Sequence, residues 1–309
     1  MRRELTLKGS VEFEGKGLHS GHTSKIILKP APEDTGLVFI SKSGAVNQFI
    51  PYSVENVVDT RNNISISNGR ALIKTVEHLV SSLYALHIDN CIIECFSNEI
   101  PILDGSAGEF VRKIMEVGVV EQTKNREEFR VINPIWSTLD DKYIVALPYN
   151  GLKCCYTISF PDSPIGTQTY TDIITSESFI KNLASARTFG FLEDLENYQK
   201  NGLVLGVSID NVNVYSRKDN KAINSPRYSD EPVRHKMLDL IGSLALLNFD
   251  IKGFIIAYKA GHTLDVMFAK KVMNIYSGIN QLYTEKPYKV DTNFYIHVTP
   301  SSDGEKIPS

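Results

Sequence analysis

The sequence lacks the features of a membrane-spanning or disulfide-rich protein. No apolar stretch approaches the ~20 residues that a membrane-spanning helix needs, so no integral membrane segment is expected. The basic N-terminus is not followed by an apolar segment of the kind found in secretory signals. Four cysteines in 309 residues show neither zinc-knuckle spacing nor a disulfide framework. We therefore expect a cytoplasmic protein whose cysteines are reduced.

An excess of charge of one sign is also lacking. The chain has 33 Lys and Arg against 36 Asp and Glu, a formal net charge of −3. This balance gives no electrostatic footprint for nucleic acid, so no nucleic-acid partner is expected. The hydrophobic content of 42% is enough to bury a sizeable core, and the length suits one large domain or two ordinary ones.

The order of expected strands and helices is similar in the two halves of the chain. Each half has strands, a helix, a buried strand and a second helix, and a polar run at 121–128 without apolar periodicity separates the halves. We predict an α+β fold with two similar domains at 1–122 and 129–309. Each would be a small mixed sheet with two helices on one face, and the two would pack as a β-α-α-β sandwich. The main elements are expected at 24–28, 36–40, 75–87, 90–96, 107–117, 130–132, 142–148, 153–160, 232–247, 253–258 and 263–279.

The first helix of this scheme has two polar residues outside its apolar stripe. Val76 and Leu79 belong to the stripe that recurs at helical spacing. Because an α-helix turns by about 100° per residue, Glu77 and His78 point away from it. Thr75 is expected as the N-cap, which places both residues in the first helical turn.

The third helix carries polar residues every four positions. His235, Asp239 and Ser243 share one side, opposite the stripe that contains Met237 and Ile241. A histidine and an aspartate at this spacing can hold one metal ion from a single helix. Such a pair alone is weak evidence, because many solvent-facing helices contain one.

Together the two helices offer the residues of a mononuclear zinc hydrolase. His78, His235 and Asp239 would supply three ligands, which leaves the fourth position for water, as in catalytic rather than structural zinc sites. Glu77 lies next to a ligand and could accept a proton from that water.

A further histidine, His262, follows Gly261 between an expected strand and an expected helix. Loops at such places often carry catalytic groups, so His262 could be a general acid or could stabilise an oxyanion. An ordinary surface-loop histidine is the equal alternative. His19 and His22 have metal-like spacing but no third partner, so we expect them to be structural or weakly substrate-facing.

Six ordered blocks carry a resemblance to a known family. They are Gly17-Leu18-His19-Ser20-Gly21, Thr75-Val76-Glu77-His78-Leu79, the run from Glu99 to Ser106, Ala186-Arg187-Thr188-Phe189-Gly190-Phe191, Val233-Arg234-His235-Lys236-Met237-Leu238-Asp239 and Gly261-His262. In these blocks the chain resembles the zinc-dependent UDP-3-O-acyl-N-acetylglucosamine deacetylases of lipid A biosynthesis. The resemblance implies a fold of two α+β domains, one zinc ion per chain, and UDP-3-O-acyl-N-acetylglucosamine and water as substrates. A monomer is expected.

The resemblance also implies roles for individual residues. His78, His235 and Asp239 would bind zinc, and Glu77 would activate water. His262 would stabilise the oxyanion or protonate the leaving amine, and Thr188 would help to hold the tetrahedral intermediate. The substrate-contacting residues would be Phe189 and Lys236 at the sugar, Lys259 at the diphosphate, and Leu192, Leu195, Val204, Ser208, Val212 and Val214 in an acyl-chain insert at about 190–216.

Three positions depart from the family pattern. Ser243 stands where the family usually has an aspartate that pairs with the catalytic histidine, so His262 should be less readily protonated. Asp265 stands where asparagine is usual, and our hypothesis is that it replaces the lost carboxylate. The loop at 59–64 is basic and polar where the family has a more apolar stretch.

Two alternatives to an active deacetylase of this substrate stay open at the level of sequence. The chain could be a non-catalytic or weakly active relative that binds a nucleotide sugar or an acyl lipid. It could also be a zinc amidohydrolase that acts on a different amide.

Overall fold

The structure is a computed structural model that describes residues 2–284. Residues Met1–Met273 form one compact unit, and a second unit begins at Asn274. The end of the predicted second domain, at 285–309, lies outside the described residues. The first unit contains two lobes, one from each half of the chain.

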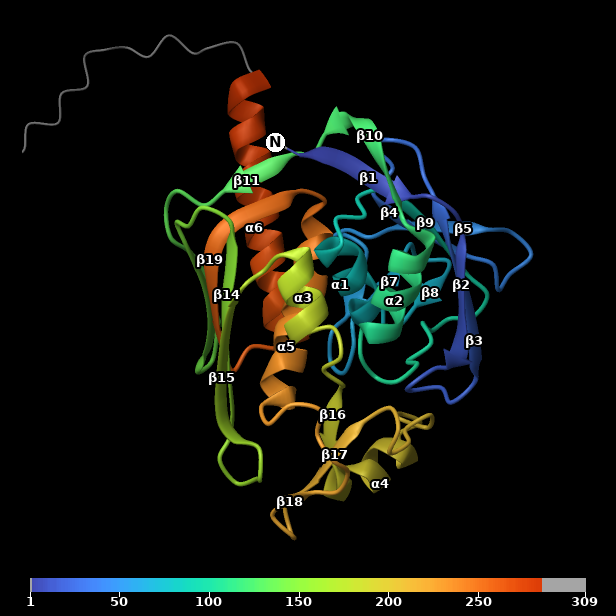
Figure 1. The fold of residues 1–309 in the computed structure, drawn as a ribbon, viewed down its shortest axis with the longest axis vertical. Coiled ribbons are helices and arrows are strands. Elements are labelled where there is room, and N and C mark those ends of the chain that lie inside the picture. Colours follow the sequence, from blue (N-terminus) through green and yellow to red (C-terminus); the bar gives the residue numbers. More distant parts are fainter. Residues whose placement is uncertain (1, 285–309) are drawn as a thin grey trace, which may run out of the picture. The chain divides into compact units, whose positions relative to one another are not determined.

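The first lobe is a five-stranded mixed sheet with helices on one face (Figure 1). Its strand order is β2-β3-β9-β4-β5, and β4 runs parallel to β9 while the other pairs are antiparallel. Alternating burial along β3 shows that one sheet face is core, and Phe13 contacts Phe110 of α2 across that face at 4.9 Å between ring centroids. The elements are β2 (Val11–Lys16), β3 (Thr23–Pro30), β4 (Leu37–Ser41), β5 (Gln48–Pro51), β9 (Cys91–Cys95), α1 (Glu77–Ala85) and α2 (Gly108–Val117).

The second lobe repeats this arrangement with longer strands. Its order is β12-β13-β19-β14-β15, with β11 added parallel to β19, and α5 packs on β14 and β15. The elements are β11 (Glu128–Arg130), β12 (Ile135–Leu139), β13 (Lys142–Leu147), β14 (Leu152–Phe160), β15 (Gly166–Ile173), β19 (Asp250–Tyr258), α5 (Glu231–Leu244) and α6 (His262–Thr284).

The helices of the two lobes meet between the sheets, where α1 packs against α5 (Figure 1). The approach is close enough to require glycine at 242, because a Cβ there would lie 2.5 Å from the backbone oxygen of Glu77. The predicted α+β sandwich of two similar units is therefore confirmed.

Smaller elements complete the unit. The insert between Phe189 and Ala222 has its own sheet and a short helix, α4, and lies beside the lower ends of the lobes in Figure 1. The remaining elements are β1 (Arg3–Leu7), β6 (Val57–Asp59), β7 (Ser65–Ser67), β8 (Leu72–Ile73), β10 (Val119–Asn125), α3 (Ser176–Asn182), β16 (Phe189–Phe191), α4 (Leu192–Lys200), β17 (Asn213–Ser216), β18 (Lys221–Ala222) and the 3₁₀ turn η1 (Ala245–Leu247).

One local expectation was wrong. Thr75 is not the N-cap of α1, because its φ is +59° and its hydroxyl donates to Glu99 instead, 3.2 Å away. The polar run at 121–128, which was expected to separate the halves, lies mostly in β10, which pairs antiparallel with β1. The predicted domain bounds themselves stay a prediction.

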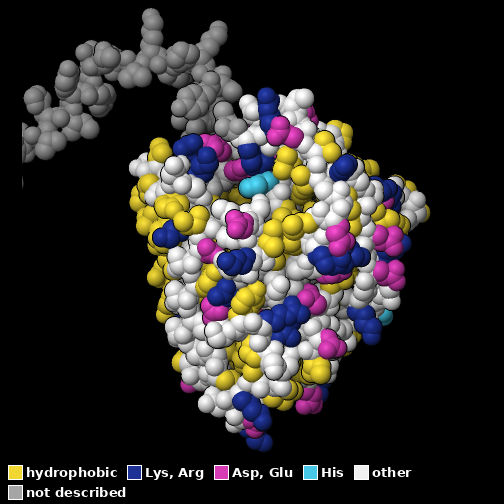
Figure 2. Space-filling model, viewed as in Figure 1, with side chains coloured by type: hydrophobic (Ala, Val, Ile, Leu, Met, Phe, Trp, Pro, Cys, Tyr) yellow, Lys and Arg dark blue, Asp and Glu magenta, His cyan; other side chains and the backbone are white. Residues whose placement is uncertain are grey.

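Three observations concern the cysteines, the surface charges and the helix composition of the described residues. All four cysteines are unpaired. Figure 2 shows basic and acidic side chains interspersed on the viewed face. Within residues 2–284, no helix is both long and apolar enough to cross a membrane.

Candidate active site

Helices α1 and α5 bring the predicted ligand cluster together. His78 lies in the first turn of α1, and His235 and Asp239 occupy successive turns of α5. One potential ligand atom from each residue lies within 4.8 Å of the others. All three residues are buried, because each helix covers the polar side of the other. The polar sides of the two helices, which the sequence placed away from their apolar stripes, therefore face each other between α1 and α5.

The donor geometry suits one small divalent ion. Asp239 Oδ1 lies 3.7 Å from His78 Nε2 and 3.5 Å from His235 Nε2. Tetrahedral ligands about 2.0–2.1 Å from zinc are separated by roughly 3.4 Å, so these spacings need little adjustment. Asp239 Oδ1 is buried without a hydrogen-bond partner in the described chain, whereas Oδ2 accepts a bond from Lys236 Nζ at 2.7 Å. The carboxylate therefore has one oxygen held and one left for an ion.

The protonation states favour metal ligation, which requires neutral imidazoles and an ionised carboxylate. Burial lowers the pKa of His78 to about 3, and burial likewise lowers the pKa of His235. Burial alone would raise the pKa of Asp239, but Lys236 and the imidazoles outweigh it and hold that pKa well below its usual range. His235 Nδ1 also lies 3.0 Å from the backbone oxygen of Ala186, so this hydrogen bond directs Nε2 toward the cluster.

Glu77 has the environment of a proton carrier. It is buried, and its Oε2 accepts the backbone N–H of Ile64 at 2.9 Å. Burial and then the charge of Asp239 raise the pKa of Glu77 to about 8. A carboxyl group with a pKa near neutrality can both accept and return a proton.

His262 is the first residue of α6 and lies beside the cluster, with its Nε2 3.8 Å from Asp239 Oδ2. Its side chain is only 13% exposed, which excludes the alternative of an ordinary surface-loop histidine. Burial and then the charge of Lys236 lower the pKa of His262 to about 3, so the imidazole is neutral near pH 7.

Asp265 was expected to replace the family's aspartate as the partner of His262, but no hydrogen bond joins the two residues. Ser243 donates its hydroxyl to the backbone oxygen of Asp239 at 3.2 Å. Asp265 is fully buried, and burial raises its pKa to about 8. Among the residues described, neither oxygen of Asp265 nor Nδ1 of His262 has a hydrogen-bond partner. Asp265 is therefore placed in the protein interior without contacting His262 through a hydrogen bond.

The cluster opens into a cavity of about 440 Å³, which we call the polar chamber. It is lined by Glu77, Thr188, Phe189, Lys236 and His262, among others. Lys259 does not line it; its Nζ is instead 2.6 Å from the carboxylate of Asp141.

A second cavity of about 160 Å³, which we call the apolar passage, adjoins the polar chamber. Thr188 and Phe189 line both cavities. The insert supplies most of the passage wall through Leu192, Leu195, Val204, Val212 and Val214, as expected. Ser208 is exposed and does not line it.

Several residues that line the two cavities were not expected there from the sequence. Lys142 and Tyr198 reach the polar chamber from β13 and α4, and only the folded chain shows this. His19, considered structural or weakly substrate-facing, lines the apolar passage, and neither ring nitrogen has a partner among the described residues. Arg61, in the loop noted for its basic character, lines the polar chamber.

Two buried histidines and an aspartate around one ion position, with a buried glutamate alongside, define the class of metal-dependent hydrolases. The sequence profile of the UDP-3-O-acyl N-acetylglycosamine deacetylase family (LpxC) matches residues 4–274. The chain belongs to this family.

Proteins named UDP-3-O-acyl-N-acetylglucosamine deacetylase are similar over nearly their whole length. The chain is 39% identical to that of Leptospira biflexa serovar Patoc, covering 92% of this chain and 94% of the relative. It is 36% identical to that of Chlamydia abortus, covering 89% and 98%. It is 38% identical to that of Oleidesulfovibrio alaskensis, covering 87% and 88%.

Proposed function

We propose that this protein hydrolyses the acetamide of UDP-3-O-acyl-N-acetylglucosamine, a step of lipid A biosynthesis, and releases acetate and the free amine. The observation that carries the proposal is the junction of the two cavities. A polar chamber with a metal-type cluster and a proton carrier shares lining residues with an adjoining apolar passage. This junction suits an amide and an acyl chain carried by the same substrate.

His78, His235 and Asp239 would hold one zinc ion per chain. Bound there, zinc would lower the pKa of water from 15.7 toward about 7 and polarise the amide carbonyl. The chain's contribution is the donor set, with Lys236 fixing one carboxylate oxygen of Asp239 and Ala186 orienting His235. We further propose that the enzyme is monomeric and cytoplasmic.

Glu77 would accept the proton of the attacking water and return it to the leaving nitrogen. In the metal-free protein, burial and the charge of Asp239 raise the pKa of Glu77 to about 8. A zinc ion beside it would lower that pKa and favour the ionised form, which is the form that accepts the proton. Hydrolysis breaks the amide C–N bond. The oxygen of water ends in acetate, and the proton carried by Glu77 ends on the nitrogen of the amine.

Thr188 and His262 would stabilise the negative charge that develops on the carbonyl oxygen. Both line the polar chamber, where hydrogen-bond donors held in place by the fold can stabilise developing charge. The low pKa of His262 favours a neutral donor over an imidazolium before the substrate binds. We therefore assign proton transfer to the amine to Glu77.

The remaining assignments concern the substrate. Phe189 stands edge-on to His235, with 6.5 Å between ring centroids, and we propose that it packs against the sugar while Lys236 contacts its polar groups. Lys259 would meet the diphosphate after release from Asp141. The acyl chain would occupy the apolar passage along Leu192, Leu195, Val204, Val212 and Val214, with Ser208 at its outer side.

Ser243 and Asp265 would influence how readily His262 is protonated. Asp265 would act on His262 through the interior of the lobe, without a direct hydrogen bond. Comparison of the pH dependence of turnover in Ser243→Asp and Asp265→Asn variants tests this role; unchanged pH dependence and activity in Asp265→Asn would contradict it.

The proposed function is tested with zinc-reconstituted protein and a series of substrates. We expect acetate release from UDP-3-O-acyl-N-acetylglucosamine and much slower release from UDP-N-acetylglucosamine, which lacks the acyl chain. Equal rates on the two would favour an amidohydrolase of another amide. Zinc binding without any turnover would favour the non-catalytic relative, which family membership and the presence of Glu77 do not support.

A further inference from the structure

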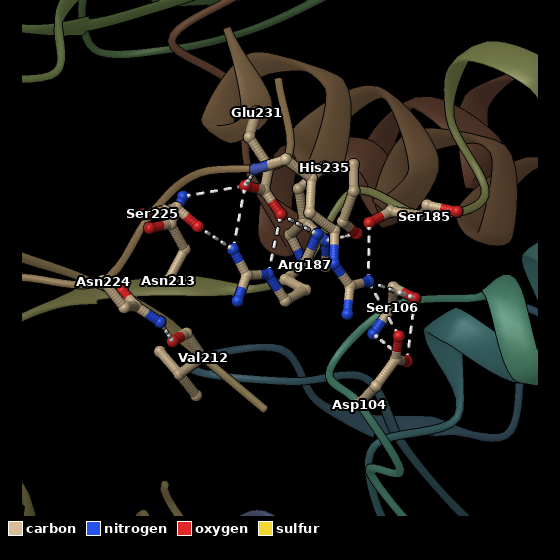
Figure 3. Close-up of polar contacts among 12 residues, drawn as sticks. Asp104, Ser106, Ser185, Arg187, Val212, Asn213, Asn224, Ser225, Glu231 and His235 are labelled. Atoms are coloured by element: carbon tan, nitrogen blue, oxygen red, sulfur yellow. Dashed lines mark hydrogen bonds and ion pairs between the residues drawn. The ribbon is translucent and has the colours of Figure 1, made fainter. Parts of the chain in front are cut away.

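The carboxylate of Glu231 is an unusual charge in this fold. It lies in the first turn of α5, one turn before His235, and the residue is 0% exposed. A buried carboxylate is costly unless it is paired and hydrogen-bonded. Glu231 is both, because it accepts five hydrogen bonds from three residues (Figure 3).

Arg187 provides three of these bonds. Its backbone N–H and its Nε each donate to Oε1 of Glu231 at 2.9 Å, and a terminal guanidinium nitrogen donates to Oε2 at 3.3 Å. That nitrogen also donates to the backbone oxygen of Ser225 at 2.8 Å. Backbone and side chain of Arg187 are thus fixed by the same carboxylate.

The other two bonds come from separate segments. Asn213, at the start of β17 in the insert, donates its side-chain amide to Oε2 at 3.1 Å. Arg227, in the loop before α5, donates its backbone N–H to Oε2 at 2.6 Å. One carboxylate therefore joins α5, the segment at 186–188, the insert and the loop at 225–227.

This junction reaches the proposed ion site through Ala186. The backbone oxygen of Ala186 accepts the hydrogen bond that orients the His235 ring, and Ala186 directly precedes Arg187. Glu231 thus fixes both the helix that carries His235 and the segment that orients it. Such outer contacts set the direction and basicity of a metal-binding imidazole.

The same junction reaches the apolar passage through Thr188. The backbone N–H of Asn213 donates to the backbone oxygen of Thr188 at 2.8 Å, and β16 pairs with β17 from the next residue onward. Thr188 lines both cavities. The segment that orients His235 is therefore also the segment at which the two cavities meet.

We propose that Glu231, with Arg187 as its partner, is a positioning residue that aligns His235 for the metal ion and fixes Thr188 at the junction of the cavities. The inference rests on the proposed metal site, but it does not depend on which amide is the substrate. Its action is indirect, because neither Glu231 nor Arg187 lines the polar chamber.

The test is metal affinity and ligand geometry in a Glu231→Gln variant of the full chain. The amide keeps the shape of the side chain but offers only one acceptor oxygen. Depending on the orientation of the amide, either the two Arg187 donors on Oε1 or the three donors of Arg187, Asn213 and Arg227 on Oε2 would face an NH2 group and lose their acceptor. We expect zinc binding, measured by competition with a chelator, to weaken by about 10-fold or more. The visible absorption spectrum of the cobalt-loaded variant should also differ from that of the wild type.

Glu109→Gln is the matched control. Glu109 also pairs with an arginine, since Arg112 Nε donates to it at 2.8 Å, but this pair is exposed on α2. The same chemical change there should leave zinc affinity and the cobalt spectrum unaltered. If Glu231→Gln fails to fold, Arg187→Lys keeps the positive charge but loses the planar fork, and zinc binding should weaken by about threefold or more.

A folded Glu231→Gln or Arg187→Lys variant with wild-type zinc affinity and a wild-type cobalt spectrum would overturn the inference, even if its melting temperature fell. The readouts require no turnover. If the wild type binds zinc but releases no acetate, the proposed function fails while these measurements still decide the role of Glu231.

Discussion

The polar chamber and the apolar passage share Thr188 and Phe189 but are built in different ways. The reacting groups of the chamber stand on α1 and α5, which pack so closely that Gly242 has no room for a side chain. The passage is walled by an insert whose helix α4 has no fully buried residue. The chemistry therefore lies between the lobes, and acyl-chain recognition lies on a peripheral addition.

This difference implies that the two regions can be changed separately. A change in the polar chamber should alter turnover for every substrate, and a change to one of the proposed metal ligands there should also alter metal binding. A change in the apolar passage should alter only the response to acyl length. Substitutions in each region test that separation, in order of decreasing expected effect.

The largest effect is expected from His235→Ala. Loss of a ligand should weaken zinc binding by more than about 100-fold, because changes to outer contacts alone already cost about 10- to 100-fold. Turnover should fall in parallel for all acyl lengths. Chelator competition and acetate release check this; wild-type zinc affinity in the variant would remove His235 from the ligand set.

Thr188→Val should lower kcat by about 100-fold, because it removes one donor to the developing oxyanion while keeping the side-chain volume. Thr188→Ser retains the hydroxyl and serves as the control, with most of the activity kept. Zinc affinity should be unchanged in both. Equal kcat in Thr188→Val and Thr188→Ser would contradict the oxyanion role.

Leu195→Trp should shorten the apolar passage and lower kcat/KM for the longest acyl chains by about 10-fold, since each methylene left in water costs about 0.8 kcal/mol. Short acyl chains should be unaffected. Ile209→Trp is the control, because Ile209 is 65% exposed and does not line the passage. An equal loss for all acyl lengths would break the separation of the two regions.

A smaller, pH-dependent effect concerns the stability of the metal-free protein. Folding raises the pKa of Glu77 from 4.5 to about 8. At pH values between these two, Glu77 is protonated in the folded state and ionised in the unfolded state. The stability that Glu77 contributes is therefore present below pH 4.5 and is lost as the pH rises toward 8. Glu77→Gln cannot lose a proton.

The melting temperature of metal-free Glu77→Gln, measured relative to wild type, should therefore increase between pH 5 and pH 8. Three pH units at about 1.4 kcal/mol each set an upper limit of about 4 kcal/mol, and half of that limit, about 2 kcal/mol, corresponds to roughly 4–8 °C. The two proteins should be compared by thermal unfolding in the presence of a chelator. A melting-temperature difference that stays constant with pH would show that Glu77 is ionised in the folded protein.

The sequence allowed the sandwich to be predicted from the repeated order of strands and helices, and the ligand cluster from helical periodicity. His235 and Asp239 share a helix face at any tertiary arrangement. The burial of Glu77 and His78 could not be read from α1 alone, because α5, which covers them, comes from the other lobe.

Long-range contacts explain the remaining differences. The conformation of Thr75 is set by Glu99, and the run at 121–128 becomes a strand through β1, neither of which leaves a local signal. Lys259 and Ser208 line neither cavity. For Lys259 the long-range contact is its ion pair with Asp141. Glu231 had one local signal, an acidic residue in the first turn of α5, but four of its five hydrogen bonds come from residues 18 or 44 positions away along the chain.

The central claim is that Glu77 carries the proton in a metal-dependent deacetylation. The most direct measurement is acetate release from UDP-3-O-acyl-N-acetylglucosamine by zinc-loaded wild type and zinc-loaded Glu77→Gln, with equal zinc content verified in both. The account predicts a loss in kcat of about 100-fold or more in the variant. Equal rates at equal zinc content would contradict it.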